Sequence, residues 1–357
     1  MPNEKTSGRP LRAGDLVEVR GAAEILATLD AEGELDALPF MPEMIGYVGR
    51  RFPVAGRAEK VCDTVRYSGS RRLADTVLLA DLRCDGAGHA GCQAECRLFW
   101  KEAWLRRVEP GAPSSPPPPG HDEAVRELAA RAGAHTTRTV QAEKGSALRY
   151  RCQATELPRA TVRLRTLDPR PYLRELTCGN VSLGRFLRVT ARAAIEEPLA
   201  RLGLVADVPV KGTSPSSPKT EQLGLGPGEW VQVRSAAEIE GTLNDKGKNR
   251  GLWFDREMLA FCGRTFRVRR RITKIVDDRT GELIEMKSDC VTLEGVVCSG
   301  DRSLARWFCP RQIYPYWREG WLRRAEAPAE APAAESPDSG DAPPAARAAG
   351  APGPRSG

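Results

Sequence analysis

One short stretch of this 357-residue chain combines the residue types that bind transition metals. Residues 84–96 read CDGAGHAGCQAEC and place one histidine among three cysteines: Cys84, His89, Cys92 and Cys96. Four such ligands satisfy Zn²⁺ in a closed tetrahedral site, which helps to fold a domain with a thin core. Glycines in the stretch let backbone and sulfur atoms approach a common centre. Cys62, on a predicted strand before the stretch, is the candidate fourth thiolate.

A second group of four cysteines follows later in the chain, at Cys262, Cys290, Cys298 and Cys309. Neither this group nor the first, with its C-x7-C-x3-C spacing, contains the tight C-x2-C pair of common zinc motifs. Structural zinc is the leading interpretation for both groups. The alternatives are an iron–sulfur cluster, a catalytic or redox metal site with His89 as an exchangeable ligand, and buried cysteines without any ligand.

Composition narrows the classes of function. The ten cysteines, in a chain whose N-terminus lacks an apolar signal region, predict reduced thiols and a cytoplasmic protein. Cys152 and Cys178 stand apart from both groups, and burial accounts for them most simply. No run of 18 apolar residues occurs, so we expect no membrane partner. The net charge of +7 comes from 54 basic and 47 acidic residues, a mixed surface that supports nucleic-acid binding only weakly.

Known catalytic motifs are missing from the chain. It contains no phosphate-binding Walker loop, no G-x-S-x-G and no H-E-x-x-H, and its one G-x-G-x-x-G, at 86–91, lies within the cysteine stretch and not at the start of a predicted helix. Only three histidines are present, so the usual proton shuttle is scarce. A nucleotide-dependent enzyme, a Rossmann dehydrogenase or a common hydrolase is therefore not expected.

The sequence repeats itself at a constant offset. The segment from Gly14 matches the segment from Gly228, 214 residues later, without a gap as far as Cys84 and Cys298. Three residues are then inserted, and FWKEAWLRR at 99–107 meets YWREGWLRR at 316–324. We predict that only Cys84 and Cys298 coincide among the cysteines. Two independent four-ligand sites on one duplicated scaffold, superposing in space, would produce this pattern.

The elements that must position these cysteines are mostly strands. Each repeat begins with an alternating strand, DLVEVR or EWVQVR, followed by a short helical stretch and further alternating segments that form hairpins. About five short strands per repeat indicate a small SH3-like β-barrel. The middle of the chain carries helical patterns, one of them with a capping Asp168 and Pro169. The predicted fold is mainly β with α: two tandem small SH3-like β-barrel repeats separated by a small helical segment.

Changes of composition give the predicted boundaries. Pro, Ser and Gly-rich stretches read as extended linkers, and the two ends lack the apolar content for a core. The expected order is a disordered N-terminus (1–12), repeat one (13–109), a Pro-rich linker (110–120), a helical middle segment (121–206), a linker (207–226), repeat two (227–325) and a disordered tail (326–357).

The end of each repeat is a candidate binding surface because it combines aromatic and basic side chains. A barrel face of this kind could stack on bases, sugars or a peptide. The alternative, which we favour for the tryptophans, is that they close the barrel core. The residues are Trp100, Trp104, Arg106 and Arg107 in the first repeat, and Trp317, Trp321, Arg323 and Arg324 in the second.

Three stretches resemble a known family: 84–107, 298–324 and GNVSLGRFLR at 179–188. They are similar to a family of uncharacterised bacterial proteins with tandem cysteine-rich, β-barrel-like repeats. The resemblance implies a bacterial source and an intact duplicated protein. It implies no catalytic residue, because the family has no activity that could be carried over.

Together these observations predict a non-catalytic, metal-stabilised protein, with zinc as the metal, that acts as a binding or adaptor protein toward a protein partner or a polymer ligand. The first alternative is a metalloenzyme or iron–sulfur redox protein in small-molecule or carbohydrate metabolism, built on Cys84, His89, Cys92 and Cys96. The second alternative is a nucleic-acid-binding regulator.

Overall fold

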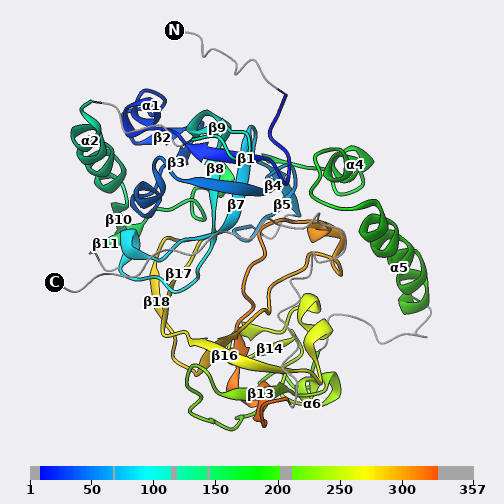
Figure 1. The fold of residues 1–357 in the computed structure, drawn as a ribbon. Coiled ribbons are helices and arrows are strands. Elements are labelled where there is room, and N and C mark those ends of the chain that lie inside the picture. The colour runs from blue at the N-terminus through cyan, green and yellow to red at the C-terminus, as the bar shows by residue number, and fades with distance from the viewer. Residues whose placement is uncertain (1–8, 67–68, 114–118, 143–144, 202–210, 329–357) are drawn as a thin grey trace, which may run out of the picture.

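The protein combines helices with antiparallel sheets, some of which curl, and a half-barrel is present. The computed structural model describes residues 9–66, 69–113, 119–142, 145–201 and 211–328 (Figure 1). We call residues 9–113 the first half and residues 211–328 the second half. The expected mixture of strands and helices is found.

The first half is built on a five-stranded antiparallel sheet in the order β8-β7-β4-β1-β9. The strands of this sheet are β1 (Leu16–Val19), β4 (Arg51–Arg57), β7 (Thr76–Arg83), β8 (Arg97–Lys101) and β9 (Leu105–Arg107). Shorter elements connect them: α1 (Ala22–Leu26), β2 (Glu34–Leu35), β3 (Leu38–Pro39), η1 (Pro42–Tyr47), β5 (Val61–Cys62), β6 (Ser70–Arg72), η2 (Ala87–His89) and η3 (Glu102–Trp104).

The second half carries a five-stranded sheet in the order β20-β19-β16-β13-β21. Its strands are β13 (Trp230–Val233), β16 (Thr265–Arg271), β19 (Cys290–Leu293), β20 (Trp317–Arg318) and β21 (Leu322–Arg324). The connecting elements are α6 (Ala236–Glu240), β14 (Lys248–Asn249), β15 (Leu252–Trp253), η4 (Arg256–Phe261), β17 (Lys274–Val276), β18 (Leu283–Glu285), η5 (Leu304–Arg306) and η6 (Glu319–Trp321).

The two sheets agree in register as well as in strand order. Val17 lies opposite Phe52 between β1 and β4, and Val231 lies opposite Phe266 between β13 and β16. The ladder between β4 and β7 shifts by one residue after Val54, and the corresponding ladder between β16 and β19 shifts in the same way. Residues of the two halves can therefore be matched position by position.

Each half has its own aromatic core, and this corrects the predicted binding surface. Trp100, Trp104, Trp317 and Trp321 are all fully buried. The ring of Phe40 meets Trp104 edge to face at 5.1 Å, and in the second half Phe254 meets Trp321 in the same way at 5.2 Å. Such pairs add to the stability that burial of apolar area provides. The tryptophans close the cores and offer no surface for stacking.

The middle segment divides its contacts between the two halves. It comprises α2 (His121–Ala134), β10 (Thr137–Ala142), β11 (Gly145–Tyr150), α3 (Leu157–Ala160), β12 (Val162–Arg163), α4 (Pro169–Thr177) and α5 (Leu183–Arg201). Leu128 of α2 and Leu157 of α3 join the core of the first half. Phe186 of α5 stacks on Phe308 of the second half at 5.2 Å. Asp168 caps α4 by accepting from the backbone N–H of Arg170, as predicted.

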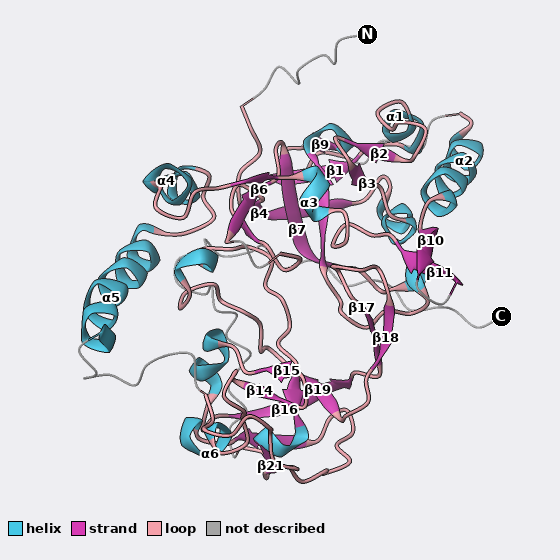
Figure 2. Cartoon of the chain, turned by 180° about the vertical axis from the view of Figure 1, so that it is seen from behind, coloured by secondary structure: helices cyan, strands magenta, loops and turns pink. Residues whose placement is uncertain are grey.

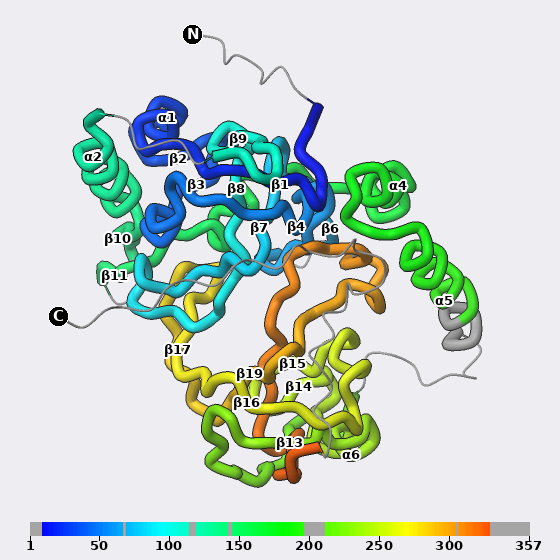
Figure 3. The backbone as a smooth tube through the Cα atoms, in the orientation of Figure 1, coloured from blue at the N-terminus to red at the C-terminus, as the bar shows by residue number. Residues whose placement is uncertain are grey.

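Two segments cross between the halves. The hairpin β17–β18 extends from the second half to the first, where the N–H of Gln93 donates to the carbonyl of Lys274. Its turn also meets the middle segment, where the N–H of Tyr150 donates to the carbonyl of Gly281 (Figure 2). The segment around η5 also reaches the first half, and the tube in Figure 3 shows it (orange) running beside β4 and β6. There Lys60 Nζ donates to the carbonyl of Trp307 at 2.8 Å. These crossings place loops of both halves around one shared space.

The predicted linkers and ends are described only in part. Residues 211–226 pack on the second half: Leu225 is fully buried, and Glu319 accepts from three backbone N–H groups at residues 223–225. Residues 1–8, 114–118, 207–210 and 329–357, which include most of the predicted disordered ends, lie outside the described residues. Among the described helices, none is long and apolar enough to span a membrane.

Candidate metal centre and the cavity between the halves

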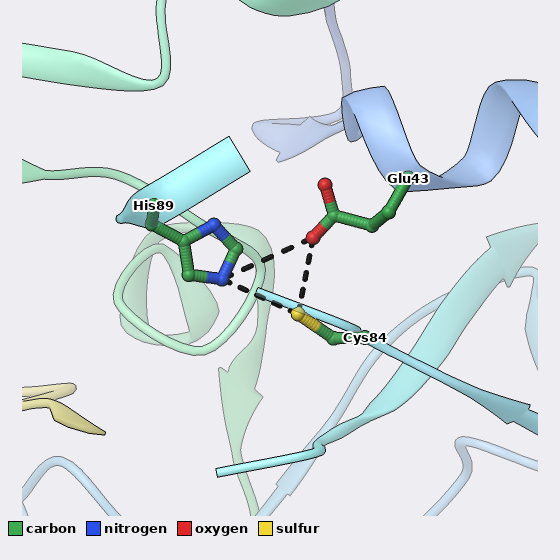
Figure 4. Close-up of side chains that lie close together, drawn as sticks. All are labelled: Glu43, Cys84 and His89. Atoms are coloured by element: carbon green, nitrogen blue, oxygen red, sulfur yellow. Dashed lines mark hydrogen bonds and ion pairs between the residues drawn. The ribbon is translucent and has the colours of Figure 1, made fainter. Parts of the chain in front are cut away.

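Three side chains of the first half converge on one point: Glu43, Cys84 and His89 (Figure 4). The thiol of Cys84 donates to Oε1 of Glu43 at 3.0 Å, and its Sγ lies 3.3 Å from Nε2 of His89. The third distance, from Nε2 of His89 to Oε1 of Glu43, is 3.9 Å. One sulfur, one nitrogen and one oxygen atom thus lie close enough together to bind one metal ion.

Local backbone structure places each ligand. Glu43 lies in the first turn of η1, which begins with Pro42 because proline fits the first helical position. Cys84 directly follows β7. Gly86 then turns the chain with a positive φ of 79°, and its carbonyl accepts from the N–H of His89 at 3.0 Å. This tight turn brings the imidazole back over the thiol, and glycine adopts it without the steric cost of a side chain.

The electrostatic environment suits a bound cation. Burial raises the pKa of the Cys84 thiol well above its usual value, and the neighbouring Glu43 raises it further. Burial lowers the pKa of His89, so its imidazole is neutral near pH 7 and has a free lone pair. A cation at this point would favour the thiolate, and metal binding would release the thiol proton.

Two polar atoms of the cluster are buried without a hydrogen-bond partner: Oε2 of Glu43 and Nδ1 of His89. A buried acceptor without a partner costs free energy, so such atoms call for an explanation. A metal ion bound to the carboxylate would supply the positively charged partner that Oε2 of Glu43 lacks. The residues present therefore fit a divalent metal.

The equivalent carboxylate of the second half has a different environment. Glu257 corresponds to Glu43, with the repeat offset of 214. Its two oxygens accept from the hydroxyl of Ser299 and from the backbone N–H groups of residues 301–303, at 2.9 to 3.2 Å. Residues 301–303 are the three inserted residues of the second repeat, so the insertion satisfies Glu257.

Arg306 is the second difference between the two loops. η2 and η5 are equivalent, so Arg306 takes the position of His89. Its guanidinium pairs with Asp255, and its charge lowers the pKa of the nearby Cys298, although burial raises that pKa more strongly. The second half thus carries a permanent cation beside Cys298, the counterpart of Cys84, and the first half carries the imidazole of His89 at the equivalent position.

A second pair of cysteines also proves equivalent, which corrects the sequence alignment. The backbone N–H of Val276 donates to Sγ of Cys92 at 3.2 Å, and the N–H of Cys62 donates to Sγ of Cys309 at 3.3 Å. Cys62 and Val276 are matching hairpin residues, so Cys92 and Cys309 are matching loop residues. We predicted no partner for Cys92 because the position of the insertion was unknown.

Both contacts join opposite halves. Each hairpin docks on the loop of the other half, so Cys62 meets Cys309, a residue of the second repeat. The predicted sets of four ligands drew each site from one repeat only. Among the described residues, no such set brings three or more ligand atoms within 4.8 Å of one another.

The remaining cysteines do not belong to the Glu43–Cys84–His89 cluster, although Cys96 and Cys152 line the same cavity. Cys96 contacts Cys84 through the backbone: its carbonyl accepts from the N–H of Cys84. Cys290 is buried in β19 opposite Arg318, and Cys262 ends η4. Cys152 joins the core of the first half, and burial raises the pKa of Cys178 to about 11. Burial of Cys152 and Cys178 is what the sequence predicted.

A cavity of about 560 Å³ lies between the two halves. All three members of the cluster line it, together with Cys62, Cys298 and Arg311. A metal ion on the cluster would therefore face a space large enough for a small molecule.

The four arginines of the predicted binding surface are engaged with acidic side chains. Their partners are Glu24 for Arg106 (3.2 Å), Asp15 for Arg107 (2.7 Å), Glu238 for Arg323 (3.7 Å) and Glu229 for Arg324 (2.9 Å).

Sequence reasoning missed Glu43, because one acidic residue in a helical turn has no distinctive spacing. The only signal was the conserved position of an acid in both repeats, Glu43 and Glu257, within the shared "EM" pair. The chain matches no protein-family model, no curated protein and no solved structure.

Proposed function

We propose that this chain is a metal-binding protein in which Glu43, Cys84 and His89 hold one divalent transition-metal ion. Zinc is the first candidate, because it accepts sulfur, nitrogen and oxygen ligands together in tetrahedral geometry. A single thiolate in the set argues for one ion rather than an iron–sulfur cluster, whose irons are held largely by thiolates.

The contrast between Glu43 and Glu257 carries this proposal. Both carboxylates are held at the same position beside a cysteine. Glu257 receives four hydrogen bonds and has Arg306 in the same loop, whereas Oε2 of Glu43 receives none. A carboxylate kept buried and short of donors in only one half is best explained by a cation that this half alone binds.

The ion would stabilise a contact between the two halves. The loop at 84–96 carries two of the ligands and contacts the hairpin β17–β18, where the N–H of Gln93 donates to the carbonyl of Lys274 at 3.1 Å. Fixing this loop by a metal would fix the contact. In this function the metal is structural: it stabilises a binding protein and takes part in no reaction.

We also infer that the two halves are copies of one SH3-like unit. The matching strand order, registers and ladder shifts support this inference. The chain then resembles a dimer fused into one polypeptide, in which one metal site was kept and the other was replaced by Arg306.

Catalysis is a second candidate function, favoured by the number of ligands. Structural zinc sites use four protein ligands, whereas catalytic sites use three and leave one position for water or substrate. The cluster has three, and it lines the cavity. A zinc-activated water there would make the protein a metalloenzyme acting on a small molecule.

Metal analysis of purified protein tests the proposal. We expect one zinc ion per chain in the wild type. Removal of a ligand in Cys84→Ser or His89→Ala should weaken zinc affinity by more than about 100-fold, since loss of a supporting residue alone costs 10 to 100-fold. The affinity is measured by competition with a chromophoric chelator.

Cys298→Ser is the matched control, because it removes the equivalent thiol of the second half. It should leave the zinc content unchanged. The proposal is contradicted if Cys298→Ser releases as much zinc as Cys84→Ser, or if His89→Ala keeps full affinity.

A further inference from the structure

Two cysteines from opposite halves lie against each other. Cys62 ends β5 in the first half, and Cys309 follows η5 in the second. The N–H of Cys62 donates to Sγ of Cys309 at 3.3 Å, and the two thiols share a hydrogen bond. Neither belongs to the Glu43–Cys84–His89 cluster, and neither is in a disulfide.

We propose that Cys62 and Cys309 form a redox-active dithiol that a low-molecular-weight disulfide oxidises to a disulfide bond between the two halves. The thiolate of Cys62 attacks one sulfur of the small disulfide, and the other sulfur leaves as a thiolate. Cys309 then gives up its proton and attacks the mixed disulfide on Cys62, releasing the second small thiol. The protein loses two electrons and two protons, and the small disulfide becomes two thiols.

Arg311 stabilises the attacking thiolate. Its Nη1 donates to the carbonyl of Cys62 at 3.0 Å and lies 3.8 Å from Sγ of Cys62. The hydroxyl of Thr64 accepts from the same nitrogen at 3.1 Å and helps to hold it there. A buried guanidinium beside a thiol favours the reactive thiolate form, because the two charges attract each other strongly away from water.

The two thiols have different roles. The hydrogen bond from Cys309 lowers the pKa of Cys62 to about 6, and the charges of Arg311 and Arg306 act in the same direction. Burial, together with the neighbouring Cys62, raises the pKa of Cys309. Because the guanidinium of Arg311 also lies beside the sulfur of Cys62, we assign Cys62 as the attacking residue and Cys309 as the resolving one.

The two thiols also differ in how a small disulfide can reach them. Cys62 lines the cavity of about 560 Å³, through which a small disulfide reaches it. Cys309 is not among the residues that line this cavity and lies instead at a small recess beside Asn180 and Arg185, so a reagent in the cavity meets Cys62 before Cys309.

The other crossing supplies an internal comparison. Cys92 stands where Cys309 stands and accepts the same kind of backbone hydrogen bond, but the hairpin residue opposite it is Val276. Only one of the two crossings has a pair of thiols. Cys92→Ser is therefore a matched control for Cys309→Ser.

The test uses the full-length chain and 2-hydroxyethyl disulfide as the probe. Remaining thiols are alkylated, and the linked peptides are identified by mass spectrometry. In the wild type, the first disulfide to form should join Cys62 to Cys309. Cys309→Ser should stop at one mixed disulfide on Cys62, Cys62→Ser should give no adduct on Cys309, and Cys92→Ser should behave like the wild type.

Three results would overturn the proposal: a different pair, such as Cys62 with Cys298, forms first; Cys92→Ser blocks the reaction; or Cys62 stays free at a probe concentration that oxidises the urea-unfolded chain. If a variant fails to fold, the map of the wild type alone decides. The outcome is separate from that of the zinc measurement, because neither thiol belongs to the Glu43–Cys84–His89 site.

Discussion

Glu175 is a carboxyl group that the fold holds in its neutral form. Its side chain in α4 is fully buried, one oxygen accepts from Asn180 at 2.6 Å, and the other has no partner. Burial raises the pKa of Glu175 to about 8. The hydrogen bond from Asn180 and the charge of Lys60 lower this pKa but offset only part of the effect of burial. Since the unfolded chain releases this proton at a much lower pH, ionisation of Glu175 favours unfolding as the pH rises.

Glu175→Gln should remove this dependence. The native state binds the extra proton between the unfolded value near 4.5 and the folded value of about 8, so the wild type loses stability as the pH rises through that window. As the pH rises, the unfolding free energy of the wild type should fall relative to that of Glu175→Gln by at most about 1.4 kcal/mol per pH unit. Urea unfolding at pH 5.5 and 7.5 measures it. A difference that is independent of pH, as expected for Glu127→Gln at an exposed position, contradicts the prediction.

The ligands show how far sequence reasoning reaches at this scale. Cys84 and His89 stood out because cysteine and histidine close together are uncommon and have specific chemistry. Cys62 and Cys92 were assigned to the same site because spacing within one repeat was the only guide. Their real neighbours come from the other half, and no local pattern encodes that.

Among the elements, the turn at Gly86 is decisive for the metal loop. A Cβ atom at Gly86 would collide with the backbone of Cys92, and the positive φ adds strain. Gly49 also has a positive φ, of 74°, but a Cβ there has open space. We expect Gly86→Ala to lose zinc binding. Gly49→Ala should cost roughly 1–3 kcal/mol in unfolding free energy and keep its zinc.

Zinc titration and urea unfolding of the two variants give the comparison. Equal zinc affinity in both variants would show that the turn does not position the ligands.

The strands were predictable because alternation of apolar and polar residues determines which face is buried. We predicted about five strands per repeat, whereas each described half has nine, of which five form its main sheet and the rest are short. The direction in which β17–β18 extends was not predictable, because it depends on contacts such as that between Gln93 and Lys274, which are far apart in the sequence.

At the scale of the whole molecule, the crossings couple the two halves. Arg83 donates to the carbonyl of Gln312 at 2.9 Å, and Lys60 donates to that of Trp307, so backbone of the second half is held by side chains of the first. We expect one cooperative unfolding transition. Tryptophan fluorescence, which reports on both cores, and far-UV circular dichroism should give the same urea midpoint. Two separate transitions would mean that the halves fold independently.

The central claim is that one metal ion is bound by one thiolate, one imidazole and one carboxylate of the first half. X-ray absorption at the zinc edge of the purified wild-type chain tests it most directly. The account predicts one sulfur at about 2.3 Å, with the remaining ligands nitrogen or oxygen at about 2.0–2.2 Å. A shell of three or four sulfur atoms, or a protein that binds no metal, would contradict the account.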